Sequence, residues 1–161
     1  SFSEKEFDKF KEKLKSKTKK PQTEFDKEQR KEFLKGAEIA YETIINSFAN
    51  GDKKSLEELL TKEMRKNFET AIEERNKKNI KSELTFIGIK SSVVENFEKT
   101  TNALFFTVKF VSEIISVKRD KDNNVIEGDP NKIKTVIDRW KFTRPMSSMS
   151  PNWYLSEIKN T

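Results

Sequence analysis

The chain of 161 residues contains no cysteine and no histidine. Without cysteine there are no disulfide bonds, thiolate nucleophiles or cysteine metal sites, and without histidine the commonest general base and metal ligand is missing. Only four glycines are present, and none lies in a phosphate-binding loop or a dinucleotide fingerprint. The composition therefore excludes cysteine and histidine chemistry, and we expect no metal and no cofactor.

Long apolar runs are also missing, because the longest candidate covers only residues 103–106, whereas a membrane-spanning helix needs about 18 apolar residues or more. No signal-peptide pattern opens the chain. Since the first residue is Ser1 rather than methionine, we expect a processed protein or a fragment, from which an anchor could have been cut. A hydrophobic content of 33% against 37% charged residues predicts one domain with a small core and an appendage.

Positive charge dominates, since 33 lysines and arginines against 27 acidic residues give a net charge of +6. Such a balance favours anionic partners: phospholipid head groups, nucleic acid or acidic protein surfaces. Most of the excess lies in residues 1–20, where eight lysines minus four acidic residues give +4.

Apolar residues interrupt this basic segment at helical spacing. Phe7, Phe10 and Leu14 form a stripe, with Phe2 near its edge. A solvated helix or a disordered tail is the alternative, but a tail that serves only solubility has no need of phenylalanines. We therefore predict a basic amphipathic helix that contacts a membrane through Phe2, Phe7, Lys9, Phe10, Lys13, Leu14 and Lys17.

The sequence predicts two parts. Pro21 predicts a hinge over residues 16–22, which separates an N-terminal segment, 1–22, from a domain, 23–161. Apolar spacing predicts a helix over 24–50, ended by Asn50 and Gly51. Ser55 and Thr61 then predict the starts of a second and a third helix.

After residue 80 the apolar period changes from 3.6 to 2, which indicates strands. Helices followed by hairpin-connected strands predict an α+β fold: a curved antiparallel sheet of about four strands, with three helices packed on one face and the basic helix in front. The predicted strands cover residues 84–92, 104–114, 136–142 and 153–158.

One local pattern resembles a metal site. Asp120, Asp122 and Asn124 occupy the first, third and fifth places of a calcium-binding loop, but Val125 and Asn131 stand where glycine and glutamate are required. The segment is therefore predicted to be a hairpin turn.

Asp138 is a candidate general base, because it shares a strand face with Trp140 and Phe142 and an apolar environment raises the pKa of a carboxyl group. A lone carboxylate near a strand end is more often solvated or paired with arginine. We therefore predict no catalytic residue.

Five ordered blocks of the sequence carry a family resemblance. The blocks are FLKGAEIAYETIINSFANGD at 33–52, SLEELL at 55–60, VIEGDP at 125–130, RWKFTR at 139–144 and PNWYL at 151–155. They resemble the C-terminal domain of the forty-four-kilodalton subunit of the mitochondrial inner-membrane protein translocase, in particular its bacterial relatives, over residues 29–158.

The resemblance implies a nuclear-transport-factor-like or cystatin-like sheet with an apolar cavity between sheet and helices. It also implies a non-enzymatic scaffold, peripheral or anchored, on the cytoplasmic side of a bacterial inner membrane. Such a scaffold binds anionic, cardiolipin-like phospholipid and recruits protein partners, such as a chaperone or translocase, in protein translocation or membrane-protein biogenesis. Residues of the cavity wall would be Tyr41, Phe110, Trp140 and Phe142.

Two other functions stay open. Another branch of the superfamily docks ribosomes at the membrane, and Arg139 and Arg144 would then contact RNA. The cavity could instead bind a small apolar molecule or an acyl chain. No small-molecule substrate is expected.

Overall fold

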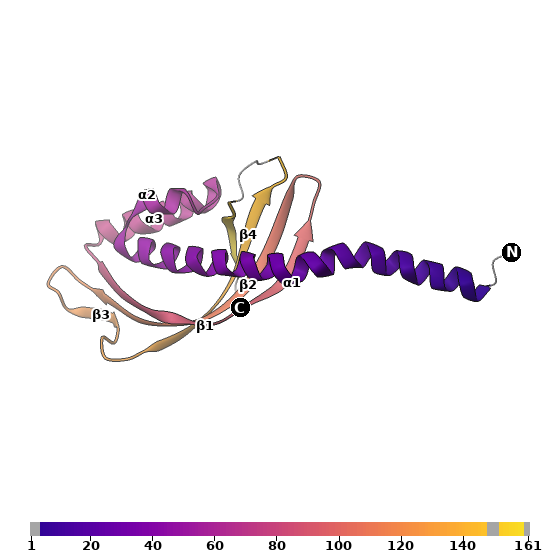
Figure 1. Ribbon diagram of the computed structural model, residues 1–161. Coiled ribbons are helices and arrows are strands. Elements are labelled where there is room, and N and C mark those ends of the chain that lie inside the picture. The colour runs from indigo at the N-terminus through magenta and orange to yellow at the C-terminus, as the bar shows by residue number, and fades with distance from the viewer. Residues whose placement is uncertain (1–3, 148–151, 160–161) are drawn as a thin grey trace. The chain divides into compact units, whose positions relative to one another are not determined.

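The computed structural model describes the backbone of residues 4–147 and 152–159, with the side chains of all of these except 4 and 7–26. Contacts divide the chain into two compact units, Ser1–Gly36 and Ala37–Thr161. The second unit contains the sheet and most of the helical structure (Figure 1). Each unit is described by itself below.

The first helix, α1, runs without interruption from Glu4 to Asn50. The backbone of residues 16–22, where a hinge was predicted, is helical. Proline removes one main-chain hydrogen bond, but the lysine, glutamate and glutamine residues on both sides have high helix propensity and favour a continuous helix. The functional division between residues 1–22 and 23–161 stays a prediction.

Two short turns of chain connect α1 to the helices that follow. Gly51 adopts a left-handed conformation with φ of 69° and ends α1. Helix α2, Lys53–Glu57, begins earlier than predicted, because the carboxylate of Asp52 rather than the hydroxyl of Ser55 caps it. Helix α3, Lys62–Lys77, begins as predicted, and the Thr61 hydroxyl accepts a hydrogen bond from the Met64 amide at 3.4 Å.

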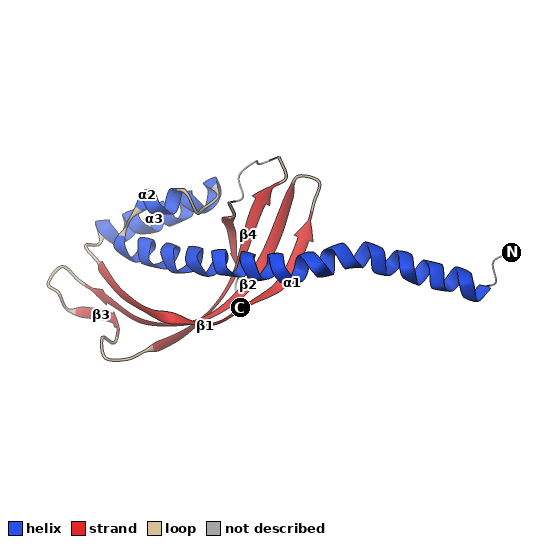
Figure 2. Ribbon diagram, viewed as in Figure 1, coloured by secondary structure: helices blue, strands red, loops and turns tan. Residues whose placement is uncertain are grey.

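The strands form one antiparallel sheet in the order β1-β2-β4-β5, with β3 paired to β2 (Figure 2). This confirms the predicted α+β class, with five strands instead of about four. The additional strand is β3, whose exposed residues give no alternating signal. The bounds are Lys81–Lys99 for β1, Ala103–Arg119 for β2, Val125–Gly128 for β3, Lys134–Pro145 for β4 and Tyr154–Lys159 for β5.

The predicted hairpin turn after β2 is confirmed. The carboxylate of Asp120 accepts hydrogen bonds from the amides of Asp122 and Asn124, each at 2.9 Å, and Asn123 has a φ of 67°. These hydrogen bonds and the left-handed residue stabilise the turn that joins β2 to β3.

The core lies between one face of the sheet and the helical residues of the second unit. Alternate residues of β2, among them Phe106 and Phe110, are buried together with Trp140 and Phe142 of the neighbouring strand β4. From α1, Tyr41 and Ile44 are buried. Fully burying one such side chain stabilises a fold by about 1.5 to 3 kcal/mol, so a few of these residues account for much of the stability.

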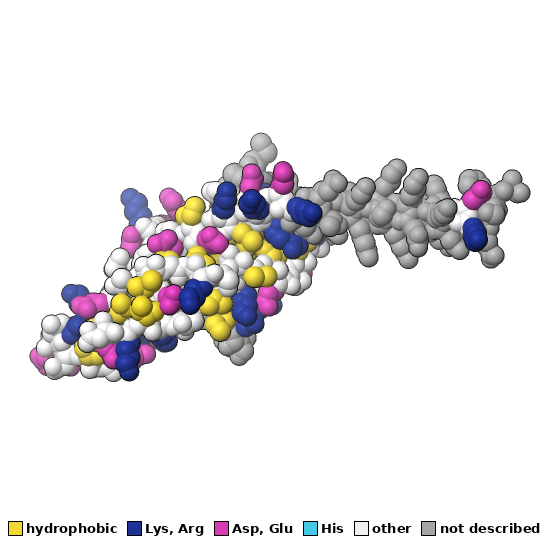
Figure 3. All heavy atoms as spheres, turned by 60° about the horizontal axis from the view of Figure 1, so that its bottom comes forward, with side chains coloured by type: hydrophobic (Ala, Val, Ile, Leu, Met, Phe, Trp, Pro, Cys, Tyr) yellow, Lys and Arg dark blue, Asp and Glu magenta, His cyan; other side chains and the backbone are white. Residues whose placement is uncertain are grey.

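The opposite face of the sheet carries mixed side chains. Ile87, Val93 and Ile137 are each about half exposed, at 48%, 53% and 49%. Among them Arg139 donates a hydrogen bond to Glu95 at 2.8 Å. In Figure 3, which brings the lower side of the Figure 1 view forward, small hydrophobic areas alternate with side chains of both charges. Isolated apolar residues of this kind are ordinary for a protein surface.

Candidate functional site: a groove beside strand β5

A buried polar cluster lies where α1 meets the middle of the sheet. The Tyr41 hydroxyl donates a hydrogen bond to Oδ2 of Asp138 at 2.6 Å and lies 2.9 Å from the hydroxyl of Ser112. Tyr41 and Ser112 are both completely buried. Burial raises the pKa of Tyr41 well above its ordinary value, and the hydrogen bond to Asp138 raises it further. Tyr41 is therefore a permanent donor at neutral pH, and Asp138 is its acceptor.

The four residues predicted to line a cavity lie close together around this cluster. The Tyr41 ring stacks on Phe110 with 4.2 Å between ring centroids and lies 4.6 Å from Trp140. Phe110 in turn meets the edge of Phe142 at 6.3 Å. Tyr41, Phe110 and Phe142 are at most 1% exposed and fill the core. Trp140 is the one of the four that also lines an open space.

That space is a groove of about 820 Å³ between α1, α3, β4 and β5. Its volume lies in the range of roughly 300 to 1,000 Å³ that binding sites occupy. Most of the lining is apolar, from Ile44, Ile45 and Phe48 on α1, Met64, Phe68 and Ala71 on α3, and Trp140 and Ile158 on the sheet.

Contacts between α1 and α3 hold one wall of the groove in place. Phe48 and Phe68 meet edge to face with centroids 5.2 Å apart. The Arg75 guanidinium lies 5.1 Å from the Phe48 ring and donates a hydrogen bond to the Phe48 carbonyl at 2.7 Å. This cation therefore satisfies one of the last carbonyl groups of α1.

The polar part of the lining is acidic. It consists of the carboxylate residues Glu63, Asp138 and Glu157 together with Asn67 and Ser156. Among the described residues that line the groove there is no lysine and no arginine. This is the opposite of the chain as a whole, whose net charge is +6.

Sequence reasoning missed most of these polar residues. Glu63 and Asn67 look like the solvated face of a helix, and nothing local shows that the last strand runs beside α3. The available signal was position, since the final strand of a meander commonly lies at the edge of its sheet and Glu157 and Ile158 point to opposite faces there.

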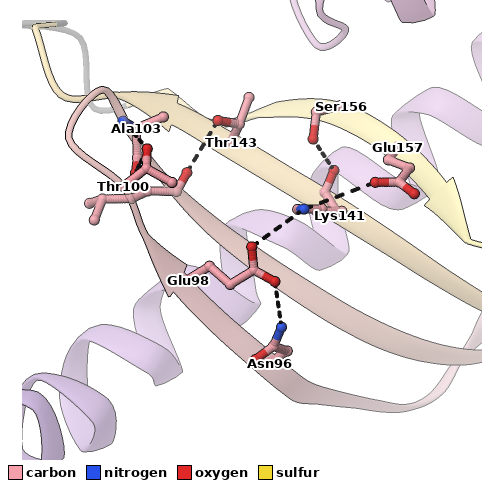
Figure 4. A network of polar contacts seen from close by, with 9 residues as sticks. Asn96, Glu98, Thr100, Ala103, Lys141, Thr143, Ser156 and Glu157 are labelled. Carbon is pink, nitrogen blue, oxygen red and sulfur yellow. Dashed lines mark hydrogen bonds and ion pairs between the residues drawn. The ribbon is translucent and has the colours of Figure 1, made fainter.

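A polar network on the outer face fastens β5 to the rest of the sheet (Figure 4). The ammonium group of Lys141 lies 3.6 Å from Glu98 and 4.0 Å from Glu157, and it also lies 4.7 Å from the ring centroid of Phe105. The Ser156 hydroxyl donates to the carbonyl of Lys141 at 2.9 Å. The network spans the register shift between β4 and β5 and holds the outer strand in place.

The residues predicted to contact a membrane belong to the first unit. Phe2 lies outside the described residues, as do the side chains of Phe7, Lys9, Phe10, Lys13, Leu14 and Lys17. The backbone of residues 7–17 is helical as predicted, so the spacing of Phe7, Phe10 and Leu14 places these three positions along one side of α1. Within the described part of the chain, no helix combines the length and the apolar character that a membrane crossing requires.

The model of the Tim44-like domain matches residues 12–160. The chain belongs to the Tim44-like domain family. Tim44-like domains are in general non-catalytic scaffold domains associated with membrane-linked protein translocation. The predicted family is thereby confirmed.

Among solved structures, this Tim44-like domain is similar to the crystal structure of the intermembrane space region of the chloroplast protein ARC6. The sequence identity is 15% and the TM-score is 0.45, over 76% of this chain and 92% of that one. No curated protein matches the chain.

Proposed function

We propose that this Tim44-like protein is a non-enzymatic scaffold at the cytoplasmic side of a bacterial inner membrane, where residues 1–20 bind anionic phospholipid such as cardiolipin and the domain recruits protein partners. The observation that carries the proposal is the helical backbone of a segment with net charge +4. On such a helix Phe7, Phe10 and Leu14 share one side between lysines, which is the pattern of an interfacial helix.

The expected attachment is weak and reversible. Each lysine close to an anionic leaflet contributes about 1 kcal/mol, so a segment of net charge +4 contributes about 4 kcal/mol before any phenylalanine inserts. Stable anchoring requires a second signal, such as a bound partner or a covalently attached anchor.

Removing residues 1–20 is expected to abolish binding to cardiolipin-containing liposomes, measured by co-sedimentation. Binding by the full chain should weaken at high salt, because salt screens the attraction between lysines and lipid phosphates. A variant with serine at Phe7, Phe10 and Leu14 keeps every lysine and separates insertion from charge. Equal sedimentation with neutral liposomes would contradict the electrostatic part of the proposal.

The same deletion is expected to leave the melting temperature almost unchanged in the absence of lipid. Residues that face a membrane do not contribute to the core of the domain, and surface segments seldom change stability by more than about 0.5 kcal/mol. Thermal unfolding of the two chains provides the comparison. A loss of several degrees would show instead that the apolar stripe is docked in solution.

The structure offers less support for an RNA tether. Arg139 is paired with Glu95 at 2.8 Å, and the Arg144 guanidinium lies 5.4 Å from the centroid of the Trp153 ring. Both cations therefore already have partners, which reduces their attraction for phosphate. Co-sedimentation with ribosomes at physiological salt tests this alternative.

A further inference from the structure

Strand β5 has one side that is open beside the groove. The order of the sheet ends at β5, so one edge pairs with β4 and the other faces away. On that second edge the Leu155 amide donates to the Leu59 carbonyl at 2.8 Å, and the Leu155 carbonyl accepts from the Thr61 amide at 3.0 Å. Beyond Leu155, no segment in the described part of the chain pairs with residues 156–158.

The open backbone lies directly against the groove, because Ser156, Glu157 and Ile158 all belong to its lining. Directly opposed residues of two strands share a face of the sheet. Ile158 is opposite the buried Trp140 and therefore faces inward, whereas Glu157 is opposite Lys141 and faces outward. An additional strand placed here would follow the same alternation.

We propose that this groove binds an extended peptide segment of a partner protein, which pairs with residues 156–158 of β5 as a further strand. Its inward side chains are apolar and pack on Ile44, Phe48 and Ile158, and its outward side chains are lysine or arginine and lie beside Glu157. The inference rests on the scaffold function proposed above and names the surface and the kind of partner that the scaffold holds.

Charge decides which kind of peptide fits. Three carboxylate residues line the groove and no lysine or arginine does so among the described residues. Glu63 makes no ion pair in the part of the chain that the structure describes. Glu157 shares Lys141 with Glu98, at 4.0 Å and 3.6 Å respectively, and the Glu157 side chain is 54% exposed. A basic segment is therefore attracted, and a fatty acid or anionic lipid is repelled.

The test measures fluorescence anisotropy of short labelled peptides with the full chain. A peptide of alternating valine and lysine is expected to bind about tenfold more tightly than one of alternating valine and serine, and a valine–glutamate peptide is expected not to bind. Methylating alternate backbone amides of the valine–lysine peptide gives two further probes. Of these two peptides, only the one whose methylated amides face β5 should lose binding.

Variants of the chain locate the site. Glu157→Gln is expected to weaken binding of the valine–lysine peptide about two- to fivefold, as for the loss of one cross-strand charge pair. Glu74→Gln is the matched control, because Glu74 is exposed on α3 and does not line the groove. It should bind the peptide as the unchanged chain does.

Three results would each overturn the inference. The valine–lysine peptide could bind no more tightly than the valine–serine peptide, or the two methylated peptides could lose affinity equally. The Glu157→Gln chain could also bind the valine–lysine peptide as tightly as the unchanged chain does. Liposome binding is measured on the same samples. The proposed liposome binding depends on residues 1–20, whereas peptide binding depends on the groove. A chain that binds the peptide but not liposomes would therefore refute the membrane part alone. A chain that binds liposomes but not the peptide would refute only the groove.

Discussion

Replacing Phe110 with alanine is expected to lower the free energy of unfolding by about 3 to 5 kcal/mol. Phe110 is completely buried at the centre of the sheet and contacts the rings of Tyr41, Trp140 and Phe142. The substitution removes apolar contacts and leaves a cavity that the surrounding rings of α1 and β4 cannot easily close. For a chain of this size the melting temperature should fall by about 10 °C or more, and denaturant titration gives the free energy directly.

Ile39→Ala is the matched control for the core substitution. Ile39 lies on α1 only two residues before Tyr41, but it is 68% exposed. Its truncation should change stability by no more than about 0.5 kcal/mol. If the two substitutions had similar effects, Phe110 would not be a central residue of the core.

Tyr41→Phe is expected to destabilise the protein by about 1 to 3 kcal/mol while keeping the aromatic packing. The substitution removes the donor to the half-buried Asp138 and the hydroxyl that pairs with the fully buried Ser112. Chemical denaturation at pH 7 provides the measurement. Unchanged stability would show that Asp138 and Ser112 find other partners.

The effect of Tyr41 also depends on pH in a defined direction. Burial and the hydrogen bond to Asp138 raise the pKa of Tyr41 above the value near 10 that it has in the unfolded chain. The folded state thus holds the phenolic proton more tightly, so the stability from Tyr41 is complete below about pH 10 and is lost as pH rises above it. The stability gap between the unchanged chain and Tyr41→Phe should shrink there by about 1.4 kcal/mol per pH unit. A constant gap up to pH 11 would contradict this assignment.

Periodicity was sufficient to predict the parts of the fold that the core controls. In β2 and β4 the alternation of Phe106, Phe110, Trp140 and Phe142 is regular because one face packs against helices, and the strands lie where the pattern placed them. The extent of β1 was underestimated, since three register shifts interrupt its alternation. The four exposed residues of β3 carry no such signal.

The exact helix ends were harder to predict, because neighbouring residues of similar type compete for the capping position. Both Asp52 and Ser55 are residue types that favour the N-cap position, and in the structure Asp52, directly after the left-handed Gly51, is the cap. The continuity of α1 through Pro21 depends on propensities on both sides of one unfavourable residue.

The candidate site was predictable only in part, because it is assembled from residues far apart in the chain. Trp140 was predicted as a wall residue and does line the groove. The hydrogen bond between Tyr41 and Asp138 joins positions 97 residues apart, and no local pattern reveals it. The acidic lining likewise forms only because α3 runs beside β5. That arrangement is set by tertiary packing, so no local sequence pattern predicts it.

The interruptions of β1 bear on how copies of the protein behave when they are concentrated on a surface. The free edge of a long strand is normally a template on which another molecule can extend the sheet. In β1 the register shifts near Ile87, Lys90 and Glu95 leave only short regular stretches, at 81–86, 88–89, 91–94 and 96–99. Charged residues lie within and between these stretches. A neighbouring molecule could form only short ladders there before its own strand lost register. Crowding would therefore favour separate molecules over self-propagating sheets, so the protein can reach high local density without aggregating along β1.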